Sequence, residues 1–406
     1  MGCALVRAYY SVHSTSNYFT LHVKEFAKIR EAKIEAAPLT LFVGDNNSGK
    51  SYLLSLLWGL TGGVNFGLLP SVQKRYRERK FDGVERLLDL WKIKNYEESN
   101  DDLDPLFSFK HTLPVTTEEQ SILAKEFNCF LAEVIAELVS EIFNTDEICI
   151  QSLCLDFPSK ADLMVGYKGH DDGLPWTLGI PNHGWHAFQY KNAFDLIERY
   201  IDLVLDKSVF VPAPRTGYLL TFGTLTQQSI HAKFSFNKGH ESGDILTSPQ
   251  VSFLKRRAAI REQDLDKFKE PIKKIIDFVE RNIIRGEIKL TKTPLPEILY
   301  KPEGLDQTLP LYLTSGVVAE VAGFLSLLKF GQFGRTCIYE EPEMCLHSEL
   351  QWKMARVLVK LVNAGFTVWA STHSDIIIQH ANNMINLSNL QTARSCGKSV
   401  ITTKMM

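Results

Sequence analysis

The stretch Gly44-Asp45-Asn46-Asn47-Ser48-Gly49-Lys50-Ser51 decides the fold. It matches the pattern G-x-x-x-x-G-K-[ST], in which the backbone N–H groups of a glycine-rich turn surround phosphate groups. The apolar residues 39–43 before it predict a buried strand, and residues 51–60 after it predict a helix that a cluster of glycines ends. Strand, glycine turn and helix in this order are the context that the pattern requires.

The residue types in this stretch suit the binding of a nucleoside triphosphate. Lys50 can reach the β- and γ-phosphates, Ser51 can ligate Mg²⁺, and the helix N-terminus adds a favourable dipole. The alternative is a glycine turn with a solvated lysine, which the flanking strand and helix disfavour. We therefore predict ATP and Mg²⁺ as ligands. The residues expected to contact the nucleotide are Gly44, Asn46, Asn47, Ser48, Gly49, Lys50, Ser51 and Tyr52.

A second apolar strand, residues 336–339, ends in the acidic turn Glu340-Glu341-Pro342-Glu343. Open α/β sheets bind their ligands at the carboxyl ends of the strands. We expect Glu340 to lie on the Mg²⁺ side and Glu341 to activate the attacking water. An acidic turn after a strand is common by itself, so this interpretation depends on the phosphate turn.

Two further segments follow the same logic. His373 comes after the predicted strand 367–370 and can sense the γ-phosphate at that edge. Ser315 and Gly316 stand at the start of a helix predicted to run to residue 330, and a helix N-terminus can bind phosphate. The alternative for this pair is a serine N-cap beside a glycine.

Composition predicts a soluble, cytoplasmic chain. Of its 406 residues 45% are hydrophobic and 23% charged, and at about 150 residues per domain the length allows two or three domains. Apolar stretches such as residues 53–60 and 317–328 are shorter than the roughly 18 residues of a membrane span, so no membrane partner is expected. The seven scattered cysteines are typical of a reducing compartment.

Strands and helices alternate with short connections, which predicts a largely parallel sheet. We expect residues 1–16 to form a loose extension, residues 17–63 and 207–406 one discontinuous head with an N-terminal antiparallel β portion, and residues 64–206 an inserted, mainly helical subdomain. Other expected helices are residues 117–143, one long helix or a pair over 249–284, and a short helix over 374–381.

Charge is nearly balanced over the whole chain. Forty-five Lys and Arg against 47 Asp and Glu leave a net charge of −2, which excludes a wholly polybasic nucleic-acid binder. The basic segments 74–80 and 255–274 leave contact with DNA or RNA open, against the alternative of a solvated helix face. A minor alternative is metal binding in a loop without fixed ligand spacing. The ligand types there are His170, Asp171, Asp172, His183 and His186.

Four motifs together resemble one family. In order, GDNNSGKS, LTSG, CIYEEPEMCLH and STHS are similar to the Walker A, signature, Walker B with D-loop, and histidine-switch elements of ABC-type ATPases of the SMC and DNA-repair class. The E-E-P-E turn followed by Leu-His is similar to OLD-like and Septu-type ATPases of bacterial anti-phage defence. The segment VFVPAPRTG, residues 209–217, resembles a Pro-Ala-x-Arg-x-Gly segment of such ATPases, which makes Arg215 a candidate sensor of the nucleotide.

The resemblance implies an ABC-type P-loop ATPase head. Two copies would close around Mg-ATP, with Ser315 and Gly316 of one copy acting on the nucleotide of the other, so hydrolysis would be slow and dimer-dependent. The chain would regulate a separate effector protein such as a nuclease. OLD nucleases carry a TOPRIM nuclease domain after the ATPase, and too few residues follow position 390 for one here, so we expect any nuclease on another chain.

The sequence departs from the family pattern in two places. Thr-Ser-Gly stands where transporters have Ser-Gly-Gly-Gln, and with the large insertion this weakens assignment to transporters. Gln227 and Gln228 are Q-loop candidates by position alone. Two other functions stay open: an SMC-like DNA-maintenance ATPase that engages DNA directly, and a nucleotide-gated scaffold or sensor with little turnover.

Overall fold

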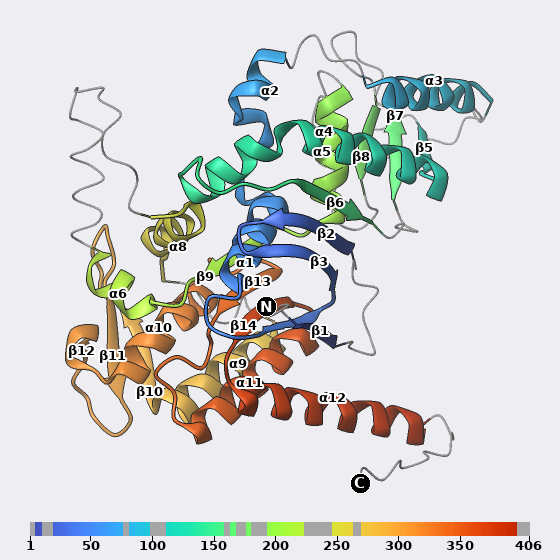
Figure 1. The fold of residues 1–406 in the computed structure, drawn as a ribbon. Helices are drawn as coiled ribbons and strands as arrows, with labels where there is room; N and C mark the ends of the chain where they lie inside the picture. The colour runs from blue at the N-terminus through green and yellow to red at the C-terminus, as the bar shows by residue number, and fades with distance from the viewer. Residues whose placement is uncertain are drawn as a thin grey trace, which may run out of the picture.

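The central element is a five-stranded sheet in the order β1-β4-β14-β13-β9 (Figure 1). The computed structural model describes residues 5–9, 19–75, 81–97, 111–157, 163–167, 176–179, 193–222, 246–262 and 269–395. The strands are β1 (Leu5–Tyr9), β4 (Leu39–Val43), β14 (Thr367–Thr372), β13 (Thr336–Glu340) and β9 (Ser208–Val211). All but β1 run parallel. The largely parallel α/β sheet predicted from the sequence is therefore confirmed.

The N-terminal segment departs from its prediction. Residues 1–16 were expected to be a loose extension, but residues 5–9 pair antiparallel with β4. The expectation is wrong for these residues because the outer edge of β4 carries backbone N–H and C=O groups that a further strand can pair.

The central strands of the sheet are buried on both faces. Every residue of β9 and β13 is buried, as covering a parallel sheet on both sides requires. Successive side chains of a strand point to opposite faces: Ile338 and Trp369 belong to one hydrophobic cluster, and Tyr339 and Ala370 to the other. We call the Ile338 side the α4 face, after helix α4 (Thr117–Phe143), and the Tyr339 side the α10 face, after helix α10 (Gly316–Lys329).

The α4 face is covered by helices and by a second, antiparallel sheet. Contributing helices are α1 (Lys50–Trp58), which continues into a π-helical turn (Gly59–Gly63), α4 (Thr117–Phe143) and α5 (Ala193–Val204). The antiparallel sheet has the order β3-β2-β6, with β2 (Phe19–Phe26), β3 (Ile29–Ala36) and β6 (Ser152–Asp156). Thr116 and Glu119 form a capping box that fixes the start of α4, at the predicted residue.

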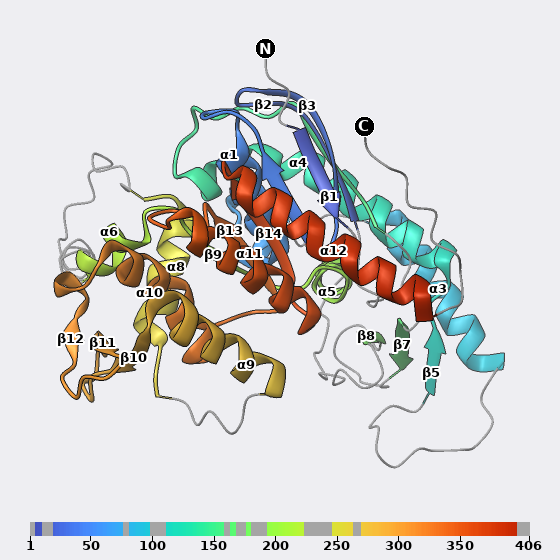
Figure 2. The same cartoon turned by 90° about the horizontal axis from the view of Figure 1, so that it is seen from below.

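The α10 face carries the C-terminal elements (Figure 2). They are α8 (Ser248–Ala259), α9 (Glu270–Val279) with its π-helical turn (Glu280–Ile284), α10 (Gly316–Lys329), α11 (Ser348–Asn363) and α12 (Asp375–Ser395). A small sheet adds β10 (Gly286–Leu290), β11 (Ile298–Pro302) and β12 (Leu309–Pro310). In the segment 249–284, where we expected one long helix or a pair, α8 ends at Ala259 and α9 begins at Glu270, so the helix is not continuous. The prediction of a short helix over 374–381 was wrong, because α12 continues along α11 to Ser395.

Among its described residues, the segment 64–206 is mainly helical, as expected, but it shares structure with the head. It adds α2 (Pro70–Arg75), α3 (Asp82–Glu97) and the sheet β5-β7-β8, with β5 (His111–Pro114), β7 (Met164–Tyr167) and β8 (Trp176–Gly179). Its strand β6 pairs with β2. Thr61 and Ser208 flank the segment, and the Thr61 hydroxyl donates to Ser208 Oγ at 2.7 Å. The division into head and insertion stays a prediction.

Three short helical elements complete the description: Phe66–Leu68, α6 (Arg215–Leu220) and Leu311–Leu313. Within the described parts of the chain, no helix has both the length and the apolar character that crossing a bilayer demands.

Candidate active site

The phosphate turn lies between β4 and α1, at the carboxyl edge of the main sheet. Its backbone is left-handed at Asn47 (φ 63°) and at Gly49 (φ 98°). A Cβ at Gly49 would lie 2.8 Å from Ile29 Cγ1, so both conformation and space require glycine there. Asn46 and Asn47 are exposed. The turn therefore presents its tip to solvent from a tightly packed base.

Lys50 is buried beneath this turn, with 6% of its surface exposed. Its Nζ donates to Gly44 O at 2.9 Å, to Asp45 O at 2.8 Å and to Ser48 Oγ at 3.4 Å. Burial lowers the pKa of Lys50, and the negative charges of Glu341 and Asp45 partly oppose this. The ammonium is thus held at the centre of the turn, where phosphate oxygens can replace the loop's own acceptors.

Glu340 and Ser51 lie together. Glu340 ends β13 with 7% exposure, its Oε2 accepts from Ala213 N at 3.2 Å, and the Ser51 side chain lies near enough to lower its pKa. Burial raises the pKa of Glu340, while Ser51 and Ala213 lower it. A hydroxyl and a buried carboxylate suit Mg²⁺, which takes few protein oxygens and completes its shell with water and substrate phosphates.

Glu341 and His373 form the next pair. Glu341 has a left-handed backbone (φ 42°), fixed by its N–H donating to Ser371 O at 3.0 Å. His373 Nε2 lies 3.6 Å from Glu341 Oε1, and both side chains are about one-third exposed, 32% and 34%. The sheet therefore brings the candidate base and the candidate γ-phosphate sensor together from the ends of neighbouring strands.

Glu343 is a site residue to which sequence reasoning gave no role. Its Oε1 accepts from Thr372 Oγ1 at 2.9 Å and from His373 N at 2.6 Å. Its Oε2 is buried and has no hydrogen-bond partner. The fourth residue of E-E-P-E was the available signal. The carboxylate ties the acidic turn to the histidine segment and so fixes the distance between Glu341 and His373.

Arg215 lies outside the phosphate turn. Only 1% of its surface is exposed, and all three guanidinium nitrogens contact protein acceptors on the ends of β9 and β13 and on α10. Its proposed role as a nucleotide sensor stays a prediction, and contact with phosphate would require it to give up some of these bonds.

The remaining predicted contacts occupy two places. Ser315 caps α10 by accepting from Val318 N at 3.4 Å, and an added Cβ at Gly316 would lie 3.8 Å from Cys345 Sγ. Both residues are exposed. The ring of Tyr52 packs against Phe143 at 5.3 Å between centroids, so much of this side chain serves the core. Nucleotide contact by these three residues stays a prediction.

The second basic segment is partly directed inward. Arg256 donates to Gln332 O and Ser208 O, and Arg257 is 4% exposed and lies over the Phe222 ring at 4.7 Å. These two cations are therefore not presented to a nucleic-acid backbone. Several earlier candidates lie outside the described residues: His170, Asp171, Asp172, His183, His186, Gln227, Gln228 and residues 76–80.

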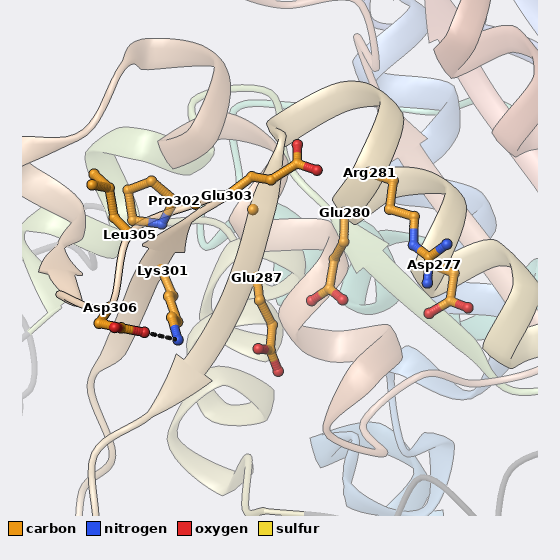
Figure 3. Close-up of a pocket in the computed structure, with 11 residues that line it drawn as sticks. Asp277, Glu280, Arg281, Glu287, Lys301, Pro302, Glu303, Leu305 and Asp306 are labelled. Atoms are coloured by element: carbon orange, nitrogen blue, oxygen red, sulfur yellow. Dashed lines mark hydrogen bonds and ion pairs between the residues drawn. The ribbon is translucent and has the colours of Figure 1, made fainter.

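A cavity of about 490 Å³ lies elsewhere, between α9 with its π-helical turn and the β10–β11 hairpin (Figure 3). Five carboxylates line it, with Arg281 and Lys301 as the cations. The carboxylates are Asp277, Glu280, Glu287, Glu303 and Asp306. This excess of negative charge disfavours phosphate. Among the described residues, no group of three or more His, Cys, Asp or Glu side chains is arranged to hold a metal ion.

Comparisons with known proteins complete the description. No protein-family model and no curated protein matches the sequence. Similar solved structures include an SMC head bound to the C-terminal winged-helix domain of ScpA, with 11% identity, a TM-score of 0.37 and coverage of 89% of this chain and 91% of that one.

Two more are SMC heads. One, derived from Pyrococcus furiosus with an extended coiled coil and bound to the C-terminal domain of ScpA, has 11% identity, a TM-score of 0.36 and coverage of 90% and 92%. The other, from Thermotoga maritima, has 13% identity, a TM-score of 0.33 and coverage of 89% and 91%.

Proposed function

We propose that this chain is a Mg²⁺-dependent ATPase of the ABC type. One observation carries the proposal: three pairs of groups meet at one sheet edge, namely the phosphate turn with Lys50, Ser51 with Glu340, and Glu341 with His373. Binding of phosphates, binding of a hard cation and activation of water are the requirements for hydrolysis of a nucleoside triphosphate.

Each residue then has a defined task. The turn's N–H groups and Lys50 bind the phosphates, and Ser51 and Glu340 would hold Mg²⁺, which supplies neutralisation of phosphate charge. Glu341 accepts a proton from water as it attacks the γ-phosphorus. His373, held near Glu341 by Glu343, hydrogen-bonds the γ-phosphate and orients it for in-line attack.

Two copies would complete the site, as the family resemblance implies. Ser315 and Gly316 are exposed, and the preceding Tyr312 and Leu313 are 71% and 61% exposed. Adjacent large apolar side chains at the surface favour coverage by a partner. If a second copy covers this surface, Ser315 and Gly316 of the first copy face the nucleotide bound by the second. Hydrolysis would then rise with protein concentration, because it needs the dimer.

The paired variants Glu341→Gln and Lys50→Ala test the ATPase. Glu341→Gln removes the base and keeps shape, so turnover should fall by about 10²- to 10⁴-fold while ATP still binds and closed dimers accumulate. Lys50→Ala should weaken ATP binding itself. Phosphate release, ATP affinity and mass by light scattering measure these outcomes, with the exposed Glu349→Gln as control. Undiminished turnover in Glu341→Gln would refute its assignment.

We further propose that the ATPase cycle regulates a separate effector, a nuclease, in bacterial anti-phage defence. This step rests on the likeness of the E-E-P-E and Pro-Ala-x-Arg-x-Gly segments to those of defence ATPases. Phage plating with this chain and its neighbouring gene tests it: protection should need both and should be lost in Lys50→Ala. Protection that survives Lys50→Ala would show that ATP is not the regulator.

A further inference from the structure

A buried ion pair connects helix α10 to the acidic turn. Arg215 begins α6, which a short connection joins to β9, and its NH1 donates to Pro212 O at 2.8 Å and to Glu340 O at 2.6 Å. Its NH2 donates to Glu341 O at 3.1 Å. The guanidinium therefore holds the backbone of both carboxylate residues on which hydrolysis depends.

The other side of Arg215 faces α10. Its NH2 lies 2.8 Å from Glu320 Oε1, and its Nε donates to Glu320 O at 3.3 Å. Glu320 Oε2 accepts from Thr216 N at 3.0 Å and from Thr216 Oγ1 at 2.5 Å. Glu320 is 2% exposed. One side chain of α10 is thus bound to the residue that holds the acidic turn.

The fit between these elements is close. A Cβ at Gly323, one turn further along α10, would lie 3.1 Å from Arg215 Cβ, so the helix backbone rests on the arginine stem. The Tyr339 ring lies 4.9 Å from the Arg215 guanidinium carbon. A shift of α10 therefore displaces Arg215, and Arg215 cannot shift without disturbing the carbonyls of Glu340 and Glu341.

Glu341 is the residue most sensitive to such a shift. Its backbone is in the left-handed region (φ 42°), which a non-glycine residue adopts only when its surroundings impose it. Two hydrogen bonds impose this conformation: the Glu341 N–H donates to Ser371 O, and the Glu341 carbonyl accepts from Arg215. The same helix α10 starts at Gly316 with Ser315 as its N-cap, and these two exposed residues lie about one turn before Glu320.

We propose that Arg215 and Glu320 are positioning residues that transmit the position of α10 to Glu341. The proposal rests on the proposed function, in which a second copy docks at Ser315 and Gly316. Docking determines the position of α10. Through Glu320 this helix determines the position of Arg215, and Arg215 in turn determines the position of the Glu341 carbonyl. Hydrolysis in one copy then depends on contact made at a different surface of the same copy.

Two conservative variants test the link, and α10 offers a matched control. Glu320→Gln keeps size and the acceptor for Thr216 but removes the charge, and Arg215→Lys keeps the charge but loses the forked contacts. The control is Glu280→Gln, which removes the carboxylate that lies 2.7 Å from Lys329 Nζ at the other end of α10. All three alter a buried ion pair of the same helix.

The first readout does not depend on ATP. Hydrogen exchange at the amides of Glu341 and His373 should be faster in Glu320→Gln and Arg215→Lys than in the full-length parent, and unchanged in Glu280→Gln. Equal protection in all four proteins would overturn the proposal. Faster exchange throughout α10 in every variant would also overturn it, because that result describes general loosening.

The second readout separates this proposal from the ATPase itself. Dimer-stimulated turnover should fall by about 10²-fold in Glu320→Gln, as expected from a small misplacement of a catalytic group, while ATP affinity and ATP-induced dimer formation stay unchanged. Unaltered turnover would overturn the link. If the parent fails to hydrolyse ATP while the exchange difference persists, the proposed function fails and the mechanical link stands.

Discussion

The two faces of the main sheet are stabilised by different kinds of contact. On the α4 face the core is mainly apolar, with aromatic contacts such as Phe127 with Phe66 at 5.8 Å between centroids. On the α10 face the apolar core is crossed by two buried ion pairs, Arg215 with Glu320 and Lys329 with Glu280. Apolar contacts tolerate small displacements, whereas a buried charge separated from its partner carries a large cost.

This difference assigns the two faces different duties. The α4 face stabilises the phosphate turn through α1 without specifying the position of any one contact. The α10 face fixes α10 against the acidic turn with directional bonds. Changes on the α4 face should therefore lower stability alone, and changes on the α10 face should lower stability and turnover together.

The largest expected effect comes from one aromatic truncation on each face. Phe127→Ala and Phe324→Ala should each lower the unfolding free energy by about 3–5 kcal/mol. Turnover per folded molecule should stay unchanged in Phe127→Ala and fall in Phe324→Ala, because Phe324 stacks on Tyr339 at 5.1 Å beneath Arg215. Denaturant unfolding and phosphate release measure both quantities, and equal turnover in the two variants would erase the distinction between faces.

A smaller effect is expected from one added methyl group on each face. Gly323→Ala presses on the Arg215 stem, and Gly59→Ala presses on the Ile142 side chain. Overpacking of this kind costs about 1–3 kcal/mol. We expect lower turnover at unchanged ATP affinity in Gly323→Ala only. A loss of turnover in Gly59→Ala would mean that the α4 face also positions catalytic groups.

A third change concerns the edge where the two faces meet. Glu343→Ala removes the acceptor for Thr372 and His373, and because His373 is partly open to water the cost in stability should be about 0.5–1.5 kcal/mol. Turnover should fall, while Glu343→Gln, which keeps an acceptor oxygen, should recover part of it. Steady-state kinetics decide this, and a fully active Glu343→Ala would show that His373 needs no such support.

The smallest effect is a pH dependence on the α10 face. Burial raises the pKa of Glu280 above its ordinary 4.5, although Lys329 lowers it. The folded chain therefore binds this proton at a higher pH than the unfolded chain does, so acidification through the raised pKa adds to stability. Glu287 acts in the opposite direction: burial raises its pKa, but Lys329 and Lys289 together lower it below its ordinary value, so the stability that this carboxylate contributes is lost in acid. Glu280→Gln should remove the gain in stability on acidification and leave the contribution of Glu287 in place. The free energy of unfolding, measured between pH 4 and 7, checks this.

The sequence was informative wherever one local segment carries both structure and chemistry. The phosphate turn, the acidic end of β13 and His373 could be placed because each follows an apolar strand, and parallel strands bring their carboxyl ends to one edge. Helix α4 could be bounded at both ends because its capping residue and its periodicity agree.

Long-range contacts could not be predicted from local pattern. Apart from Pro212 O, the hydrogen-bond partners of Arg215 come from segments more than a hundred residues away, so its burial has no signature in its own neighbours. The pairing of residues 5–9 with β4 and the length of α12 depend on surfaces formed by distant strands and helices. Glu343 was visible as an acid, but its acceptor role appears only when β13 and β14 lie side by side.

The hydrogen bond between Thr61 and Ser208 joins two residues that are far apart in the sequence. The two ends of the segment 64–206 lie side by side there, because Gly62 also packs against Lys207. A change in the length of the chain between these two ends would therefore leave them the same distance apart, and the phosphate turn and the acidic turn would keep their spacing. The contacts of this segment with α1 set the limit, because any replacement must still cover that helix.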